Sequence, residues 1–90
     1  MEEKFLAALA ANREKAAQMG VRIRPVTDMA QAKRNLSGSR TSDGFGDLAA
    51  KGQLSLSLEA LVVDKRFTAL FTDDEANTAL DRLLSAGYRF

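Results

Sequence analysis

The chain has 90 residues, of which 46% are apolar and 28% charged, and its 13 basic and 12 acidic side chains leave a net charge of +1. This length supports one hydrophobic core, and the composition is that of a folded single domain rather than a disordered or low-complexity chain. Cysteine and histidine are absent. Their absence excludes disulfide frameworks, thiolate zinc sites, iron–sulfur clusters and the imidazole that most often serves as general base or transition-metal ligand.

The first predicted helix covers residues 2–19. Its apolar stripe has helical spacing and consists of Phe5, Leu9, Ala16 and Met19. Asn12, in the middle of the stripe, either fixes the register of paired helices or marks where the apolar face thins, and Gly20 stands where a left-handed residue can end the helix. The stripe covers about two heptads, fewer than a free-standing coiled coil requires. Alanines surround it, so another helix can approach closely, from this chain or from a second copy.

The apolar run at residues 5–11 does not match a secretion or membrane signal. It has seven residues and follows two glutamates and a lysine, whereas the segment before a signal-peptide core is positively charged. A membrane span needs roughly 18 or more apolar residues. We therefore expect an intracellular, cytoplasmic protein with no membrane partner.

Residues 21–26 alternate between apolar and basic side chains, which predicts a short β-strand. Pro25 confines such a strand to a sheet edge or ends it. Thr27 or Asp28 is then expected to cap a short helix that continues to about Leu36, because the residue three positions after Asp28 is a glutamine, as in a capping box.

Residues 37–47 form the clearest predicted loop. Three glycines, three serines and two aspartates in this stretch favour turns and local hydrogen bonds. Either a short helical turn around Asp47–Lys51 or continued loop is expected to follow, with Gly52 as the stop. Loops of this length within a small domain are often functional or mobile.

Residues 53–58 alternate strictly between polar residues and leucine, which is typical of a strand. The serines in this stretch are also good helix caps, so we predict an extended piece to about Leu56 and a helix from Ser57 to about Asp64. An apolar cluster is expected to be buried in the segment that follows, in one or two further helical turns: Phe67, Leu70 and Phe71.

The last predicted helix begins at a capping box formed by Thr72 and Glu75. Its apolar face is predicted to contain Ala76, Leu80, Leu83 and Leu84, with Gly87 at the end of the helix. The tail at residues 88–90 contains two aromatic residues, which suggests that it docks on the domain.

These elements predict a mostly α single domain over residues 1–90 with about four helices. A minor two- or three-stranded sheet from residues 21–26, 53–57 and 88–90 is an open addition, and α+β is the alternative class. Such a sheet must lie against the helices, because isolated strand pairs are marginally stable.

The candidate anion- or partner-binding site consists of the basic residues between positions 22 and 40, which are Arg22, Arg24, Lys33, Arg34 and Arg40. Eight basic and five acidic side chains give residues 1–45 a net charge of +3, whereas five basic and seven acidic ones give residues 46–90 a net charge of −2. Arginine offers paired donors to phosphate or carboxylate groups. If the five side chains converge, they form a small basic surface; otherwise they neutralise the acidic half or form a solvated face.

The acidic residues predict no metal or catalytic site. Asp73, Asp74 and Glu75 are consecutive, so in a helix they point about 100° apart, and helix capping accounts for them. Asp43 and Asp47 lack the dense carboxylate spacing of a calcium loop. No nucleophile elbow or nucleotide-binding loop is present. We expect neither a metal nor a cofactor.

These observations support two hypotheses of function and a more distant third. The first is a non-catalytic protein-interaction module that binds another protein, or itself, through an apolar helix face. The alternative is a regulatory nucleic-acid-binding protein that uses the basic segment 22–40, although few aromatic residues are available for stacking and no helix-turn-helix pattern occurs. The third is an enzyme that uses the loop carboxylates, including Asp43.

Overall fold

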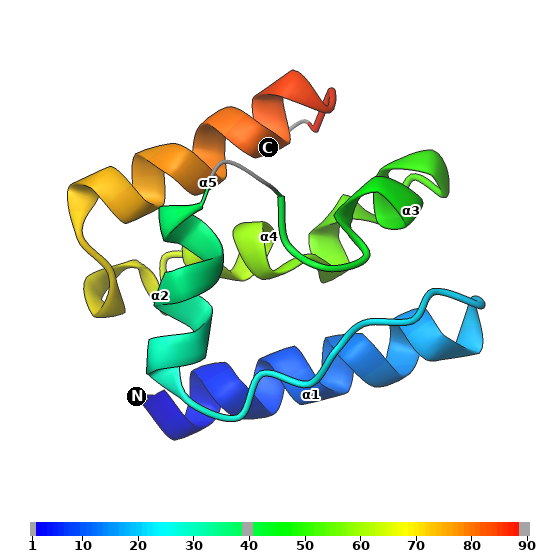
Figure 1. Ribbon diagram of the computed structural model, residues 1–90, viewed down its shortest axis with the longest axis horizontal. Helices are drawn as coiled ribbons and strands as arrows, with labels where there is room; N and C mark the ends of the chain where they lie inside the picture. Colours follow the sequence, from blue (N-terminus) through cyan, green and yellow to red (C-terminus); the bar gives the residue numbers. More distant parts are fainter. Residues whose placement is uncertain (1, 39–40, 89–90) are drawn as a thin grey trace.

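The computed structural model describes residues 2–38 and 41–88. The described chain contains five α-helices: α1 (Glu2–Gln18), α2 (Met29–Ser37), α3 (Phe45–Ala50), α4 (Leu58–Val62) and α5 (Asp73–Ser85). Two 3₁₀ turns, η1 (Leu54–Leu56) and η2 (Thr68–Leu70), lie on either side of α4 in the sequence. Figure 1 shows α1 and α5 on opposite sides of the molecule, with α4 between them. The prediction of a mostly α domain is confirmed, and the described residues form no strand.

The end of α1 agrees closely with its prediction. Gly20 has a φ of +84°, and the Val21 N–H donates to the carbonyl of Ala16 at 2.9 Å. This hydrogen bond closes the last turn, and Ala16 and Val21 are both fully buried. Met19, predicted to continue the apolar stripe, is 38% exposed because the helix ends at Gln18 and the chain turns away.

The predicted strand at residues 21–26 is wrong. Residues 21–27 are extended, but they pair with no strand in the described chain, and they run back along α1 toward the start of α2 (Figure 1). We call residues 21–27 the strap. The alternation arises because Val21 and Ile23 pack into the core whereas Arg22 and Arg24 are exposed. One buried and one exposed side give a period of two whether a sheet or a set of helices lies beneath.

The prediction of α2 is confirmed. The Asp28 carboxylate accepts a hydrogen bond from the Gln31 N–H at 2.8 Å, which caps the helix. The Gln31 side chain in turn accepts from the Thr27 N–H at 2.8 Å, one residue earlier than in a standard capping box. Ala32 and Leu36 are buried on the inner face of the helix.

The loop predicted at 37–47 is shorter, because α3 begins at Phe45 rather than near Asp47. Phe45 and Leu48, three residues apart, are both buried and therefore favour a helical turn. Gly44 precedes the helix with a φ of +76°, and a Cβ atom at this position would lie 2.7 Å from Cγ1 of Ile23. Glycine therefore allows both the left-handed turn and the close packing of the loop on the strap.

The predicted extended piece up to Leu56 is also wrong, since residues 54–56 form η1. The Ser57 hydroxyl donates to the Leu54 carbonyl at 2.6 Å and accepts from the Ala60 N–H at 3.2 Å. These two bonds fix a tight turn followed by a capped helix, so the capping role of serine outweighs the alternation. The predicted helix from Ser57 is confirmed as α4, although it ends at Val62.

The capping box of α5 is confirmed. The Thr72 hydroxyl accepts from the Glu75 N–H at 3.2 Å, and the Glu75 carboxylate accepts from the Thr72 N–H at 2.8 Å. Leu83 is fully buried, but Leu84 is 54% exposed, so its assignment to the apolar face is wrong. One residue of helix is a rotation of about 100°, which carries Leu84 off the face that packs on α4. Of the predicted tail, Tyr88 packs against the core and residues 89–90 lie outside the described chain.

The buried side chains form two clusters. The larger one centres on aromatic residues, where the ring of Phe5 makes edge-to-face contacts with Phe67 and Phe71 at centroid distances of 5.4 and 5.2 Å. The predicted burial of Phe67 and Phe71 is thus confirmed. The second cluster joins the end of α1 to α3 and α5 and consists of Ala16, Val21, Phe45, Leu48, Leu54 and Leu83. The strap passes alongside both clusters, which places its outer side chains at a surface groove.

Candidate functional site

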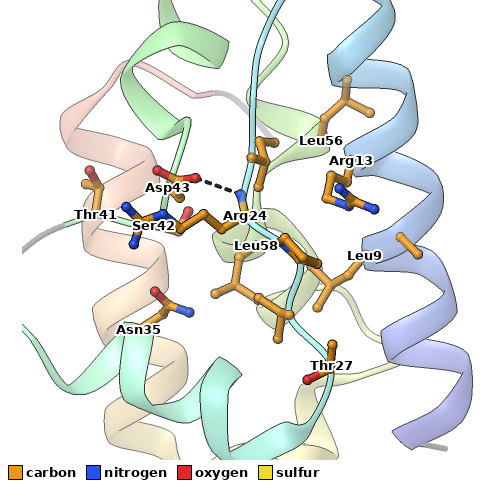
Figure 2. Close-up of a pocket in the computed structure, with 14 residues that line it drawn as sticks. Leu9, Arg13, Arg24, Thr27, Asn35, Thr41, Ser42, Asp43, Leu56 and Leu58 are labelled. Atoms are coloured by element: carbon orange, nitrogen blue, oxygen red, sulfur yellow. Dashed lines mark hydrogen bonds between the residues drawn. The ribbon is translucent and has the colours of Figure 1, made fainter.

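The candidate site is a groove beside the strap, between α1 and the loop that precedes α3 (Figure 2). Its volume is about 570 Å³, within the range of pockets that hold small molecules or side chains of a partner. Apolar side chains from α1, the strap, η1 and α4 form much of its lining: Leu9, Ile23, Pro25, Val26, Leu56 and Leu58. Leu9, Ile23, Val26 and Leu56 are half-buried, so part of this apolar surface is open to an occupant.

Two arginines lie at the edge of the groove on different elements. Arg13 lies one turn after Leu9 on α1, and Arg24 lies on the strap. In Figure 2 the Arg24 side chain extends toward Thr41 and Ser42, whereas Arg13 lies on the α1 side of the strap. Both residues are exposed. The groove is therefore apolar between two positively charged borders.

Asp43 is the acidic residue of the groove lining. Its carboxylate accepts a hydrogen bond from the Arg24 backbone N–H at 2.7 Å, which ties the loop to the strap. The neutral polar groups along the lining belong to Thr27, Asn35 and Thr41, among others, and they can donate or accept hydrogen bonds. The lining contains two guanidinium groups and one carboxylate, so its net charge is positive.

A buried ion pair holds the loop wall of the groove in place. The Glu59 side chain is 0% exposed and the Arg82 side chain 9%, and Nη1 of Arg82 lies 3.1 Å from Oε2 of Glu59. The Glu59 carboxylate also accepts from the Ser42 N–H at 2.8 Å and from the Ser42 hydroxyl at 2.5 Å. Charge-assisted bonds of this kind are stronger than those between neutral groups, so they anchor residue 42 firmly.

Arg82 connects the same loop to the end of α2. Its Nη1 donates to the Asn35 carbonyl at 3.0 Å, and its Nη2 donates to the Gly38 carbonyl at 2.8 Å. These carbonyls lie at the C-terminal end of α2, where carbonyl groups lack partners within the helix. One guanidinium thus joins α5 to Glu59 on α4 and to the end of α2.

The structure separates the basic residues that the sequence proposed as one site. Arg24 lines the groove and Arg22 is exposed on the same strap, two residues away. Lys33 instead forms an ion pair with Glu75 on α5 at 3.1 Å and lies 5.4 Å from the centre of the Phe71 ring. Arg34 is exposed on α2, where its Nε donates to the Ala30 carbonyl at 3.4 Å. Arg40 lies outside the described residues.

The ion pair of Glu75 changes the titration of its carboxyl group. Partial burial raises the pKa of Glu75. The hydrogen bond from the Thr72 N–H and the ammonium group of Lys33 lower this pKa by a larger amount, so the net result is a pKa below the ordinary value. Asp64 also has a lowered pKa, because the Arg66 guanidinium donates hydrogen bonds to its carboxylate at the surface. These carboxylates are used in capping and surface pairs and not in the groove lining.

Sequence reasoning missed Arg13, Ser42, Glu59 and Arg82. One signal for Glu59 was present, because this acidic residue stands within an apolar run, Leu58–Val63. A charge in such a run is expected to be buried, and a buried carboxylate needs a partner. Arg82 follows Glu59 by 23 positions, a separation that no local pattern would connect.

A second hollow, of about 290 Å³, lies between α5 and the segment that joins α4 to α5. It is lined by Val63, Thr68, Ala76, Asn77 and Leu80. It contains no charged side chain among the lining residues described, so it offers less chemical selectivity than the groove.

The described residues hold no group of three or more acidic side chains placed to bind one metal ion. Within the same part of the chain, no helix is long and apolar enough to cross a membrane. Comparison with protein-family models, curated proteins and solved structures found no match to this chain.

Proposed function

We propose that this chain is a non-catalytic binding module that holds a segment of another protein in the groove beside the strap, between α1 and the loop that precedes α3. The groove itself carries this proposal, because it combines open apolar surface with charged borders. Protein-binding sites commonly have an apolar centre and a polar rim. A non-catalytic role is supported by the sequence, which supplies neither histidine nor cysteine as base or nucleophile.

The firmly held loop wall supports the same proposal. The bonds from Ser42 and Arg82 to Glu59 fix one side of the groove before any partner arrives. On the other side the groove is bordered by α1, the longest helix of the described chain. Preformed walls reduce the conformational entropy that binding would otherwise cost.

The test is selection from an unbiased display library of short peptides against the full chain, with a variant whose groove is filled. Ala10 is exposed on α1 and lines the groove, so Ala10→Trp places a large ring in it. Ala11 is exposed but does not line the groove, so Ala11→Trp is the matched control. We expect peptides that bind the wild type and Ala11→Trp and lose at least tenfold in affinity for Ala10→Trp. Recovery of no groove-dependent peptide would contradict the proposal.

A second copy of the chain is another protein partner to consider. Several alanines of α1 are exposed and would allow a second helix to approach closely: Ala7, Ala10, Ala11 and Ala17. Sedimentation across a dilution series measures this directly. A monomer at high micromolar concentration would restrict the partner to a different protein.

Nucleic acid is the second candidate partner, favoured by the exposure of Arg22 and Arg24 along the strap. Binding through phosphates would weaken steeply as salt concentration rises and would require no apolar contact. A nucleic acid would therefore bind the Ala10→Trp variant as well as the wild type, which separates it from a protein segment held in the groove.

A further inference from the structure

We infer that the segment held in the groove is acidic, with an apolar side chain between two negatively charged residues. This inference rests on the proposed function and names the chemistry of its partner. It follows from the charges at the borders of the groove, the apolar surface between them and the kinds of side chain that the lining lacks.

Two separate anionic groups would complement the two border cations. Arg13 is held by α1 and Arg24 by the strap, and Figure 2 shows their side chains on opposite sides of the strap. Neither guanidinium forms an ion pair with another residue of the described ranges 2–38 and 41–88. A single carboxylate could satisfy one of these borders, whereas a chain with acidic residues on both sides of an apolar one could satisfy both.

The one carboxylate of the lining offsets only part of the charge of the two borders. Asp43 accepts the backbone N–H of Arg24 at 2.7 Å, so its contact is with the main chain of the strap and not with the guanidinium. Charge complementarity therefore favours an anionic occupant and disfavours a basic one, which would meet two cations at the rim.

The floor between the cations selects an apolar side chain. Leu9, Ile23 and Leu56 are half-buried around the groove, so an aliphatic or aromatic side chain of the partner would complete their removal from water. The lining described contains no aromatic residue. Bases of single-stranded nucleic acid are held mainly by stacking on aromatic rings, so this floor suits a peptide better than an RNA or a DNA strand.

The closing experiment uses the full chain and three display libraries of equal size. Each library has a random apolar centre, flanked on both sides by Asp and Glu, by Ser and Gln, or by Lys and Arg. Enrichment is measured on the wild type, on Ala10→Trp and on the double variant Arg13→Glu with Arg24→Glu. The matched control, Lys15→Glu with Lys51→Glu, makes the same change of net charge at two exposed positions outside the groove.

We expect the acidic library to be enriched at least tenfold over the neutral one on the wild type and on the lysine control. The border reversal should abolish that preference and enrich the basic library instead, and Ala10→Trp should remove binding from all three. Binders from the neutral or basic library that depend on the open groove would overturn the acidic partner while leaving the proposed function intact.

Two further outcomes are decisive. If no library yields a binder that Ala10→Trp weakens, the proposed function fails and the inference fails with it. A random single-stranded RNA pool, added as a fourth arm, tests the other anionic partner. RNA that binds more tightly than any peptide, is lost on border reversal and is unaffected by Ala10→Trp would replace the acidic segment by nucleic acid.

Discussion

Replacement of Glu59 by alanine should strongly destabilise the domain. The carboxylate is fully buried and accepts hydrogen bonds from Ser42 and from the Arg82 guanidinium. Its removal leaves a nearly buried positive charge on Arg82 and two donors of Ser42 without their acceptor. Leaving an uncompensated buried charge is the costly part of such a change, because the charged group has lost its water and gains nothing in return.

The magnitude follows from the burial of both partners. Removing one partner of a buried ion pair costs about 3–5 kcal/mol. A chain of this length has a total stability of roughly 5–13 kcal/mol, at about 0.05–0.15 kcal/mol per residue. The variant is therefore expected to lose a large share of its stability, and at ~4–8 °C per kcal/mol its melting temperature should fall by about 12 °C or more.

The assay is urea unfolding followed by circular dichroism, together with thermal melts of the same samples. Asp64→Ala is the control, because Asp64 forms its ion pair with Arg66 at the surface, where solvent screens the charges. Replacing Glu59 and Arg82 together by methionine should recover part of the loss, since it removes both charges. A loss for Glu59→Ala no larger than that for Asp64→Ala would refute the reasoning, because it would mean that water reaches the Glu59 carboxylate.

Three further predictions concern glycine, helix faces and pH. Gly44→Ala should lower the free energy of unfolding, measured in urea, by more than about 1 kcal/mol, because the φ of Gly44 is positive and the new Cβ meets the strap. Gly46→Ala is the control and should be neutral or stabilising, because the space at that position is open. Leu83 is fully buried, so Leu83→Ala should lower the free energy of unfolding by about 2–5 kcal/mol. Leu84 is exposed, so Leu84→Ala should lower it by less than about 1 kcal/mol, and melting of both variants measures the difference. The lowered pKa of Glu75 means that its contribution to stability is complete above the ordinary value of 4.5 and is lost as the pH falls through the folded-state pKa. Glu75→Gln should therefore be destabilising at pH 7, and its difference from the wild type in unfolding free energy should shrink toward pH 3.

Local signals made the helix ends predictable. The capping box of Thr72 and Glu75 and the cap of Asp28 are formed by residues within three positions of each other. Gly20 was similarly identified as a helix stop, and its positive φ confirms that role. Such bonds depend on neighbouring residues alone, so the sequence contains all the information needed to predict them.

The two segments predicted as extended failed for different physical reasons. In the strap, alternating burial comes from packing on helices and not from pairing with another strand. Alternation there reports which side chains are removed from water, but it does not report what lies beneath them. In residues 53–58 the alternation of polar residues and leucine does not match burial, because Ser57 is buried like Leu54 and Leu58. In this second segment the Ser57 hydroxyl bonds to the Leu54 carbonyl and to the Ala60 N–H, and these local bonds stabilise a turn rather than a strand.

The groove illustrates why a site of this kind cannot be assembled from the sequence. Its charged borders, Arg13 and Arg24, belong to elements that meet only because Gly20 reverses the chain and the strap returns along α1. Its opposite wall depends on Glu59, whose partners lie 17 residues before it and 23 residues after it. The charge density of residues 22–40 pointed to the strap, yet Lys33 from the same segment is used in an ion pair with α5. A charge cluster in a sequence thus becomes a binding surface only for those members that the fold leaves without an internal partner, and in this chain those members include Arg24.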